Sequence, residues 1–195
     1  MTKIKRYVIL TPFARAEVLA GIAALQKLDV YVVLSKSGAL LVRDMEVPQY
    51  DEWDIRNITG PDEMDAESGD PSDNAPGIAA FLSRLTPYGV VLIDVDLGDE
   101  GGFEAGVSGL VRARRFVGGE PGEEIPGGQL LNALDPAVER VVLGEKTPAE
   151  LGAIRSSDLS PEDVELLVRA ANETENTVPG KPKRGFFGRR RKDSQ

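Results

Sequence analysis

Cysteine and histidine are both absent from this chain of 195 residues. Without them the protein has no disulfide, no thiol nucleophile and no imidazole for proton transfer. The two absences also exclude zinc sites built from Cys and His, the Ser-His-Asp triad and Cys-His catalysis. Any enzyme chemistry must therefore use carboxylates, Lys, Tyr, Ser or Thr, or a hard cation held by oxygen atoms.

Long hydrophobic runs are missing as well, since no apolar stretch approaches the roughly 20 residues that cross a bilayer. The apolar segment near the N-terminus is short, meets Thr11-Pro12 and lacks a small-residue cleavage site, so we expect no signal peptide. We therefore expect a cytoplasmic protein. The apolar fraction of 41% is that of a globular chain with one sizeable core.

Charge is divided unevenly along the chain. The net charge is −9, yet residues 181–195 hold seven Lys or Arg and one Asp, so that residues 1–180 carry −15. Within this acidic part, residues 44–76 hold eleven Asp or Glu against a single basic residue, Arg56. Such asymmetry is typical of a basic tail that works separately from an acidic body.

Apolar and β-branched stretches predict a mixed sheet-and-helix fold. The expected strands are residues 4–10, 30–34, 39–42 and 90–95, and the expected helices are residues 12–28 and 77–85. Thr11 is expected to cap the first helix, with Pro12 at its first position. The resulting β-α-β-β-α-β order is that of a ferredoxin-like α+β fold. Residues 108–117 predict one extra strand, antiparallel to the strand at 90–95.

The domain organisation follows from composition. Residues 1–117 are expected to form the sheet domain, with a mobile acidic loop at about 60–76. The sequence GGEPGEEIPGG at 118–128 is typical of a linker. Residues 129–173 predict short helices packed on the sheet, with starts at Asp135-Pro136, Thr147-Pro148 and Ser160-Pro161. Residues 174–195 predict a disordered basic tail.

The strongest candidate for a chemical site is YGVVLIDVDLGDEGGFE, residues 88–104. Asp94 and Asp96 lie two residues apart in an expected strand, so their side chains point to the same face. With Glu104 they are candidate ligands for Mg²⁺, because this cation takes oxygen ligands and often uses one or two carboxylates plus a substrate phosphate. The alternative is a solvated hairpin tip that is acidic because the whole body is acidic.

Other site patterns fit this stretch less well. An EF-hand loop requires glycine at its sixth position and glutamate at its twelfth, where counting from Asp94 gives Asp99 and Ala105. No glycine-rich phosphate-binding loop stands between a strand and a helix. A glycosidase pair would use the same carboxylates, but the chain has one tryptophan and few aromatics to stack on a sugar. Arg112 and Arg114 would share a strand face, where they bind an anion or protect a sheet edge.

The basic tail is the strongest candidate for contact with another molecule. Its cations and paired phenylalanines suit an anionic membrane surface, which attracts basic residues and accepts aromatic rings. A protein partner is a second possibility, and nucleic acid would bind only through the tail. The alternative is a terminus that only improves solubility or contacts residues 44–76. The tail residues concerned are Lys181, Lys183, Arg184, Phe186, Phe187, Arg189, Arg190, Arg191 and Lys192.

These patterns favour a non-enzymatic cytoplasmic interaction or regulatory protein, peripheral at a membrane where the tail binds lipid. The acidic loop and the basic tail are its expected contact elements, and no cofactor is expected. The alternative is a Mg²⁺-dependent enzyme of phosphoryl or nucleotide chemistry that uses Asp94 and Asp96 as metal ligands.

Overall fold

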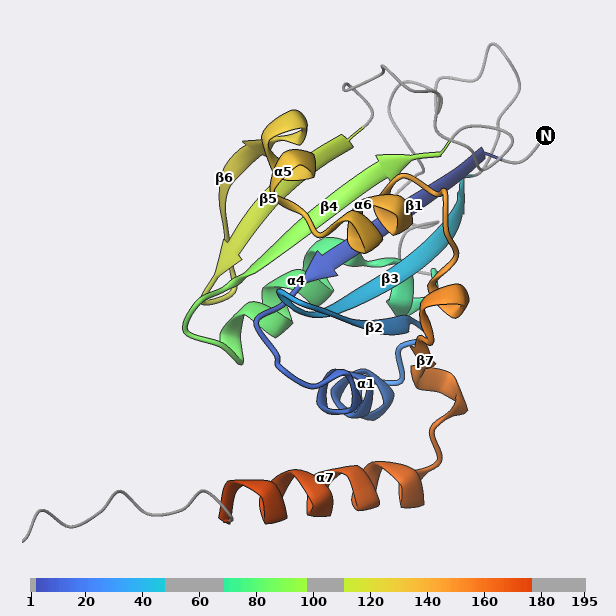
Figure 1. Ribbon diagram of the computed structural model, residues 1–195, viewed down its shortest axis with the longest axis vertical. Coiled ribbons are helices and arrows are strands. Elements are labelled where there is room, and N and C mark those ends of the chain that lie inside the picture. Colours follow the sequence, from blue (N-terminus) through green and yellow to red (C-terminus); the bar gives the residue numbers. More distant parts are fainter. Residues whose placement is uncertain (1–2, 48–68, 98–110, 177–195) are drawn as a thin grey trace, which may run out of the picture.

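A seven-stranded antiparallel sheet forms the centre of the protein in the computed structural model (Figure 1). The structure describes residues 3–47, 69–97 and 111–176. The strands are β1 (Lys3–Leu10), β2 (Tyr31–Ser35), β3 (Gly38–Val47), β4 (Val90–Asp96), β5 (Val111–Val117), β6 (Glu120–Pro126) and β7 (Ile154–Arg155). Their order in the sheet is β6-β5-β4-β1-β3-β2-β7, and each neighbouring pair is antiparallel.

Helices cover both faces of this sheet, so the predicted α+β class is confirmed. The α-helices are α1 (Ala16–Leu25), α4 (Ala75–Arg84), α5 (Gly127–Ala133), α6 (Pro136–Val142) and α7 (Pro161–Asn176). Short 3-10 helices are η1 (Pro71–Asp73), η3 (Pro148–Leu151) and η4 (Ser156–Asp158). The predicted β-α-β-β-α-β order corresponds to β1, α1, β2, β3, α4 and β4, whose strands stand in the order β4-β1-β3-β2.

The sheet extends beyond this unit on both sides. As predicted, β5 pairs antiparallel with β4. The linker prediction for residues 118–128 is wrong over most of its length, because β6 forms there and pairs with β5. The connection is a two-residue Gly118-Gly119 turn with φ values of 60° and 96°. Two glycines with positive φ are a strong hairpin signal, which the Gly, Pro and Glu content of this stretch concealed. At the opposite edge, β7 pairs with β2.

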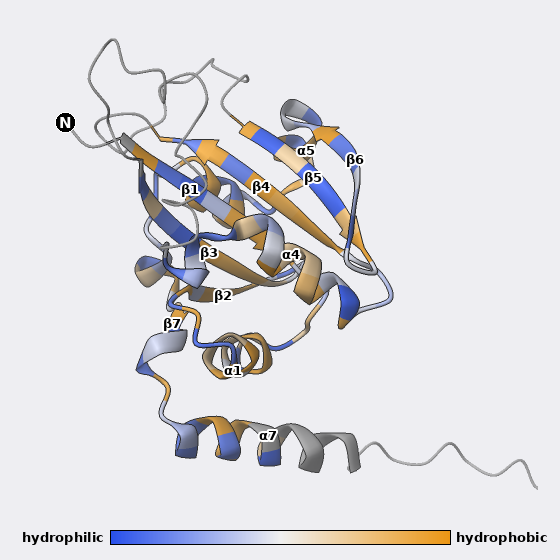
Figure 2. Cartoon of the chain, turned by 180° about the vertical axis from the view of Figure 1, so that it is seen from behind, coloured by the Kyte–Doolittle hydropathy of each residue, from blue (hydrophilic) through white to orange (hydrophobic). Residues whose placement is uncertain are grey.

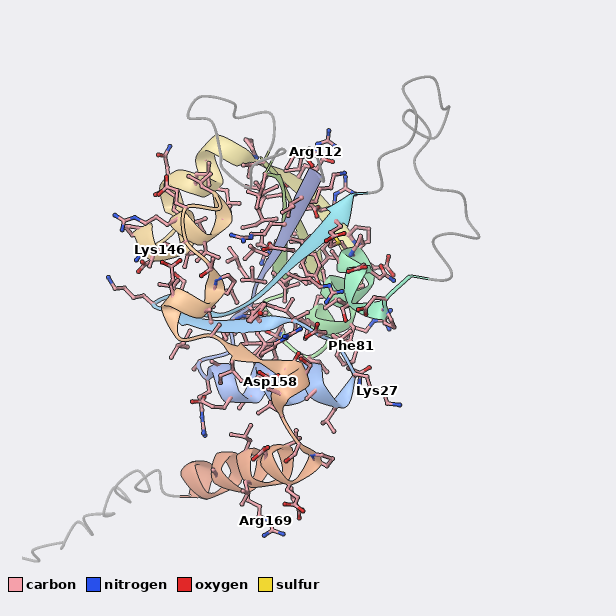
Figure 3. The ribbon with its side chains drawn as sticks, turned by 90° about the vertical axis from the view of Figure 1, so that its right-hand side faces the viewer. Lys27, Phe81, Arg112, Lys146, Asp158 and Arg169 are labelled. Atoms are coloured by element: carbon pink, nitrogen blue, oxygen red, sulfur yellow. The ribbon has the colours of Figure 1, made fainter. Side chains whose placement is uncertain are left out.

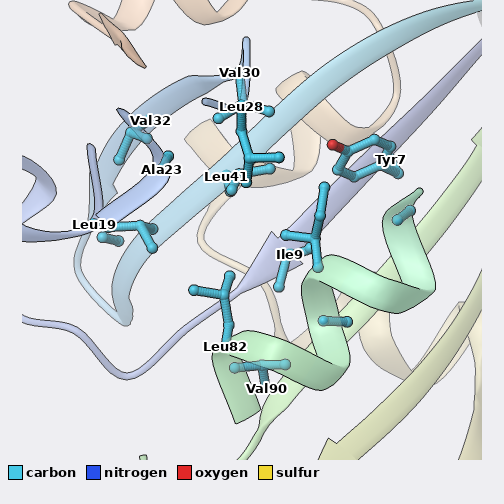
Figure 4. Close-up of a cluster of buried hydrophobic side chains, with 14 of the residues drawn as sticks. Tyr7, Ile9, Leu19, Ala23, Leu28, Val30, Val32, Leu41, Leu82 and Val90 are labelled. Atoms are coloured by element: carbon cyan, nitrogen blue, oxygen red, sulfur yellow. The ribbon is translucent and has the colours of Figure 1, made fainter. Parts of the chain in front are cut away.

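The two faces of β1 build two separate cores. Tyr7 and Ile9 point to the face covered by α1 and α4, as Figure 4 shows. Val8 points to the other face and packs with side chains of α5 and α6, such as Leu130 and Val141. Figure 2 shows the hydrophobic residues that run along β4 and α1. Because successive strand residues alternate in direction, one strand supplies both layers.

The C-terminal helices do not all pack on the sheet as expected. Helices α5 and α6 do so, but α7 lies against α1, where Val164 packs over Gly21. The predicted starts are present: Asp135 accepts a hydrogen bond from the Ala137 amide (2.9 Å), and Ser160 with Asp163 forms a reciprocal capping pair. A β-carbon at position 21 would lie 3.9 Å from the Val164 Cγ1, an ordinary van der Waals distance, so α1 and α7 pack in normal contact here.

The start of α1 differs from the prediction. The helix begins at Ala16, four residues after the expected Pro12, and its N-cap position is Arg15. The Thr11 hydroxyl instead donates to the Ala39 carbonyl (2.7 Å), while the Ala39 amide donates to the Phe13 carbonyl (2.7 Å). These bonds hold residues 11–13 against the start of β3, so the chain turns into the helix only after them.

The prediction of a mobile acidic loop is wrong for residues 70–76, while residues 60–68 lie outside the described residues. Residues 71–73 form η1, and α4 begins at Ala75. The buried Tyr7 hydroxyl donates to the Ser72 carbonyl (2.5 Å), and the Arg43 guanidinium donates to Asp70 (2.8 Å) and Asp73 (2.7 Å). Asp70 and Asp73 therefore stabilise the fold, because Arg43 of β3 compensates their negative charge through two salt bridges.

A buried arginine joins the sheet to the C-terminal layer. Arg6 of β1 is 4% exposed and donates two hydrogen bonds to the Asp44 carboxylate, at 2.5 and 2.7 Å. Its third nitrogen donates to the Val141 carbonyl (2.5 Å) near the C-terminal end of α6. A cation at this end of a helix satisfies a carbonyl that has no partner within the helix. Arg6 is thus bonded to β3 and α6 at once.

Substitution of Arg6 by methionine (Arg6→Met) should lower the free energy of unfolding by about 3 kcal/mol. The change removes the Arg6 donor from the Val141 carbonyl, which keeps only the longer bond from the Gly144 amide (3.2 Å), and it leaves Asp44 without its partner. Urea denaturation of the purified protein measures the effect. The neighbouring exposed pair provides the control: Lys5→Met removes only a 3.8 Å contact with Asp96. That variant should lose no more than about 0.5 kcal/mol. Equal losses in the two variants would contradict the role given to Arg6.

Candidate functional site

The predicted carboxylate pair lies at the end of β4. Asp94 and Asp96 occupy the same strand face as the buried Val90 and Leu92, since all four are separated by even steps. Helix α4 covers the first part of this face and leaves Asp94 exposed and Asp96 half-buried. The fold therefore presents both side chains on a partly open stretch of sheet.

The cross-strand neighbours of this pair are mostly cations. Lys5 stands opposite Asp96, and its Nζ lies 3.8 Å from an Asp96 carboxylate oxygen. Tyr7 and Arg112 stand on the two sides of Asp94. Because directly opposed charges of opposite sign attract across a sheet, the two aspartates are already partly neutralised by the protein. A bound cation would have to compete with Lys5 and Arg112.

Asp94 has an altered acidity. Although the residue is exposed overall, partial burial of its carboxyl group raises the pKa of Asp94. The positive charge of Lys5 lowers this pKa, the negative charge of Asp96 raises it further, and Arg112 lowers it. The net upward direction means that desolvation outweighs the nearby cations. The neutral form of Asp94 is therefore favoured relative to a carboxyl group in water.

A groove of about 530 Å³ lies beside Asp94, between α4 and strands β4, β5 and β6. Leu92, Ala80 and Phe116 form part of its apolar wall. The charged residues on it are Asp94, Arg112, Arg114 and Glu124. Arg114 forms a salt bridge with Glu124. Arg112, seen at the end of the sheet remote from α7 in Figure 3, has no salt bridge to any described carboxylate. The groove thus offers an apolar wall next to two guanidinium groups, of which that of Arg114 is paired with Glu124.

A second charged cluster joins β2, β3 and the C-terminal segment. The Asp29 carboxylate accepts hydrogen bonds from Arg155 (2.9 and 2.8 Å) and from the Ser157 hydroxyl (2.7 Å), and Arg43 lies 3.5 Å away. These bonds hold the pKa of Asp29 well below its usual range, chiefly through Arg155 and then through Ser157. Nearby, the buried Ser156 hydroxyl donates to the Leu28 carbonyl (2.5 Å). This cluster attaches residues 155–157 to the sheet.

The structure brings only part of the predicted site together. Asp94 and Asp96 are neighbours, whereas Glu104 and the tail residues from Lys181 to Lys192 lie outside the described residues. Within residues 3–47, 69–97 and 111–176, no group of three or more Asp or Glu side chains could hold a metal ion. Sequence reasoning did not find Lys5 and Tyr7 as neighbours of the pair, because strand register, and not sequence spacing, places them there.

Comparison with family models, curated proteins and solved structures gives no match for this chain. The support for the α+β class and for the strand order therefore comes from the structure alone. The finer ferredoxin-like assignment stays a prediction, as does the metal site.

Titration with Mg²⁺ tests the predicted metal site. If Asp94 and Asp96 bind the ion in the folded state only, the melting temperature should rise with millimolar Mg²⁺. Asp94→Asn should abolish that rise, and Lys5→Ala should increase it, because the competing ammonium group is removed. Differential scanning calorimetry measures all three proteins. A melting temperature of the parent that does not respond to Mg²⁺ rejects the site.

Asp29→Asn should destabilise the protein at neutral pH by at most about 1 kcal/mol, since the carboxylate is partly exposed to solvent. The pKa of Asp29 is lower in the folded state than the ordinary value of about 3.9, so its ionised form stabilises the fold above that pH. The difference between variant and parent should shrink as the pH falls below about 4. Unfolding curves at several pH values measure it. The control is Asp158→Asn, on the helix η4 that holds the Asp29 partner Ser157. A pH-independent difference for Asp29→Asn would contradict this account.

Proposed function

We propose that this protein is a peripheral interaction protein whose segment 181–192 binds an anionic membrane surface. The observation that carries the proposal is the segment itself, which places seven Lys or Arg around Phe186 and Phe187 in twelve residues. Each basic residue near an anionic bilayer contributes about 1 kcal/mol of attraction. Aromatic side chains add the second contribution that stable membrane association requires.

The salt bridges of the folded body support a separate, membrane-binding role for the tail. Many of its cations are engaged with carboxylates, as Arg6 is with Asp44, Arg43 with Asp70 and Arg155 with Asp29. The tail instead holds seven basic residues against one Asp193. None of the helices in the described ranges is both long and apolar enough to span a bilayer. Surface binding through the tail is therefore the mode of membrane contact that we propose.

The point of attachment also supports the proposal. Helix α7 ends at Asn176, and Figure 1 shows α7 at the end of the molecule opposite to the ends of β3 and β4. The acidic stretches 48–68 and 98–110 follow β3 and β4 directly in the sequence. The tail is thus joined to the helix that lies at the end of the body opposite to the ends of β3 and β4.

Vesicle sedimentation tests the proposal. The full chain should bind vesicles of phosphatidylcholine with about one third phosphatidylserine, and it should bind pure phosphatidylcholine weakly. Deletion of residues 181–195 should abolish binding without lowering the melting temperature. Triple substitution of Arg189, Arg190 and Arg191 by glutamine should weaken binding at least about hundredfold, because about 3 kcal/mol of attraction is lost.

Two controls separate this proposal from the alternatives. Phe186→Ser/Phe187→Ser keeps the charge, so a loss of lipid binding in this variant shows an aromatic contribution beyond attraction between charges. A competing RNA oligonucleotide distinguishes nucleic acid from lipid as the partner. If the truncated chain binds the anionic vesicles as tightly as the full chain, the proposed function is wrong.

A further inference from the structure

Three large apolar side chains are exposed together where the chain enters β4. Leu85 stands at the C-cap of α4, Tyr88 lies in the turn before β4, and Val117 ends β5; they are 47%, 72% and 46% exposed. Val90 is paired with Phe116, so Val117 lies beside Gly89, the neighbour of Tyr88. We call Leu85, Tyr88 and Val117 the β4-entry patch. Leu85 and Val117 line the same hollow, and neighbouring exposed apolar groups of this kind are found at interaction surfaces.

Hydrogen bonds fix the backbone under the β4-entry patch. The Gly119 amide donates to the Ser83 hydroxyl (2.8 Å), which ties the β5–β6 turn to α4. Arg115 donates to the Tyr88 carbonyl (3.0 Å), which ties β5 to the turn before β4. The patch is therefore a preformed part of the fold, and its exposure does not come from a loose segment.

Two arginines border the β4-entry patch. Arg84 and Arg115 adjoin it, both are exposed, and neither has a salt bridge to a carboxylate in the described part of the chain. Arg84 also lines a hollow of about 370 Å³ together with Leu85 and Val117. The acidic residues that register places at this border are Glu120, opposite Val117, and Glu123, in the irregular part of β6 opposite Arg115. Neither of these carboxylates forms a salt bridge with Arg84 or Arg115.

The acidic stretches are joined to the opposite end of the sheet. Strand β3 ends at Val47, paired with Lys3, and β4 ends at Asp96, paired with Lys5. Residues 48–68 and 98–110, which follow them, hold ten Asp or Glu against Arg56 alone. The β4-entry patch lies at the other end of β4. In the projection of Figures 1 and 2 the turn between α4 and β4 and the C-terminal end of α7 lie toward the same lateral side, while Figure 3, turned by 90°, shows Phe81 of α4 and Arg169 of α7 apart.

We propose that the β4-entry patch is a second contact with the same anionic lipid surface that the tail binds. Leu85 and Val117 would enter the apolar boundary of the bilayer, and the Tyr88 ring would lie at the headgroup level, where its hydroxyl stays hydrated. Arg84 and Arg115 would donate hydrogen bonds to lipid phosphates. This inference rests on the proposed function, because the tail brings the body to the surface and the patch then orients it.

The double variant Leu85→Ser/Tyr88→Ser in the full chain tests the patch. Its affinity for the phosphatidylserine vesicles should fall about five- to tenfold, because two exposed apolar groups no longer leave water on binding. The control is Leu25→Ser/Leu166→Ser, which removes two leucines that are 66% and 61% exposed on α1 and α7. The control should bind as the parent does, and both variants should keep the parent's melting temperature.

The possible outcomes separate the patch from the tail. If deletion of residues 181–195 abolishes binding while Leu85→Ser/Tyr88→Ser binds as the parent does, the tail proposal stands and the patch proposal is overturned. If the β4-entry patch binds a protein instead of lipid, Leu85→Ser/Tyr88→Ser should also bind the vesicles as the parent does, and the patch proposal is again overturned. If the parent does not bind the vesicles, both proposals are overturned. If Leu25→Ser/Leu166→Ser loses as much affinity for the vesicles as Leu85→Ser/Tyr88→Ser does, the patch proposal is also overturned.

An independent measurement uses fluorescence. Tyr88→Trp in the full chain should show a blue-shifted emission on vesicle binding and quenching by brominated lipid, after subtraction of the parent signal. Leu25→Trp should show neither. Absence of both changes in Tyr88→Trp, under conditions where sedimentation shows the protein bound, would overturn the patch.

Discussion

The alternation of side chains along β1 is the constraint on which both layers of this protein depend. Tyr7 points to one face and fixes η1 through the Ser72 carbonyl, while Arg6 points to the other and binds Asp44 and the end of α6. Both side chains are almost fully buried, so their polar atoms need partners inside the protein. A slip of β1 by one residue would exchange the two faces and leave both groups unpaired.

Local patterns in the sequence predicted the elements better than their partners. Periodicity located the strands around Ile4–Leu10 and Val90–Val95 because apolar content and β-branching act over a few residues. The Gly118-Gly119 hairpin was missed because its composition resembles a linker, although positive φ at both glycines makes the turn. The role of Arg6 depends on Val141, 135 residues away, and no local pattern contains that information.

The candidate site shows the same limit of local patterns. The two-residue repeat of a strand was enough to expect Asp94 and Asp96 on one face. Their neighbours Lys5 and Arg112 come from two other strands, so only the register of the sheet reveals that the carboxylates lie among cations. Asp70 and Asp73 were likewise predicted to belong to a mobile acidic loop. In the structure both form salt bridges with Arg43, which hold them against β3.

Topology explains why charge is separated along the molecule. Strands β3 and β4 flank β1 and are both antiparallel to it, so they run in the same direction and end at the same end of the sheet. The acidic stretches that follow them are consequently joined to that end, whatever their own conformation. The turn that enters β4 must lie at the opposite end, where Arg84 and Arg115 border exposed apolar groups. In the proposal made above this end of the sheet meets an anionic surface, and carboxylates at the other end, such as Asp44 and Asp96, lie several strand residues away. The screening length in physiological salt is about 8 Å, so such distant charges repel the surface only weakly.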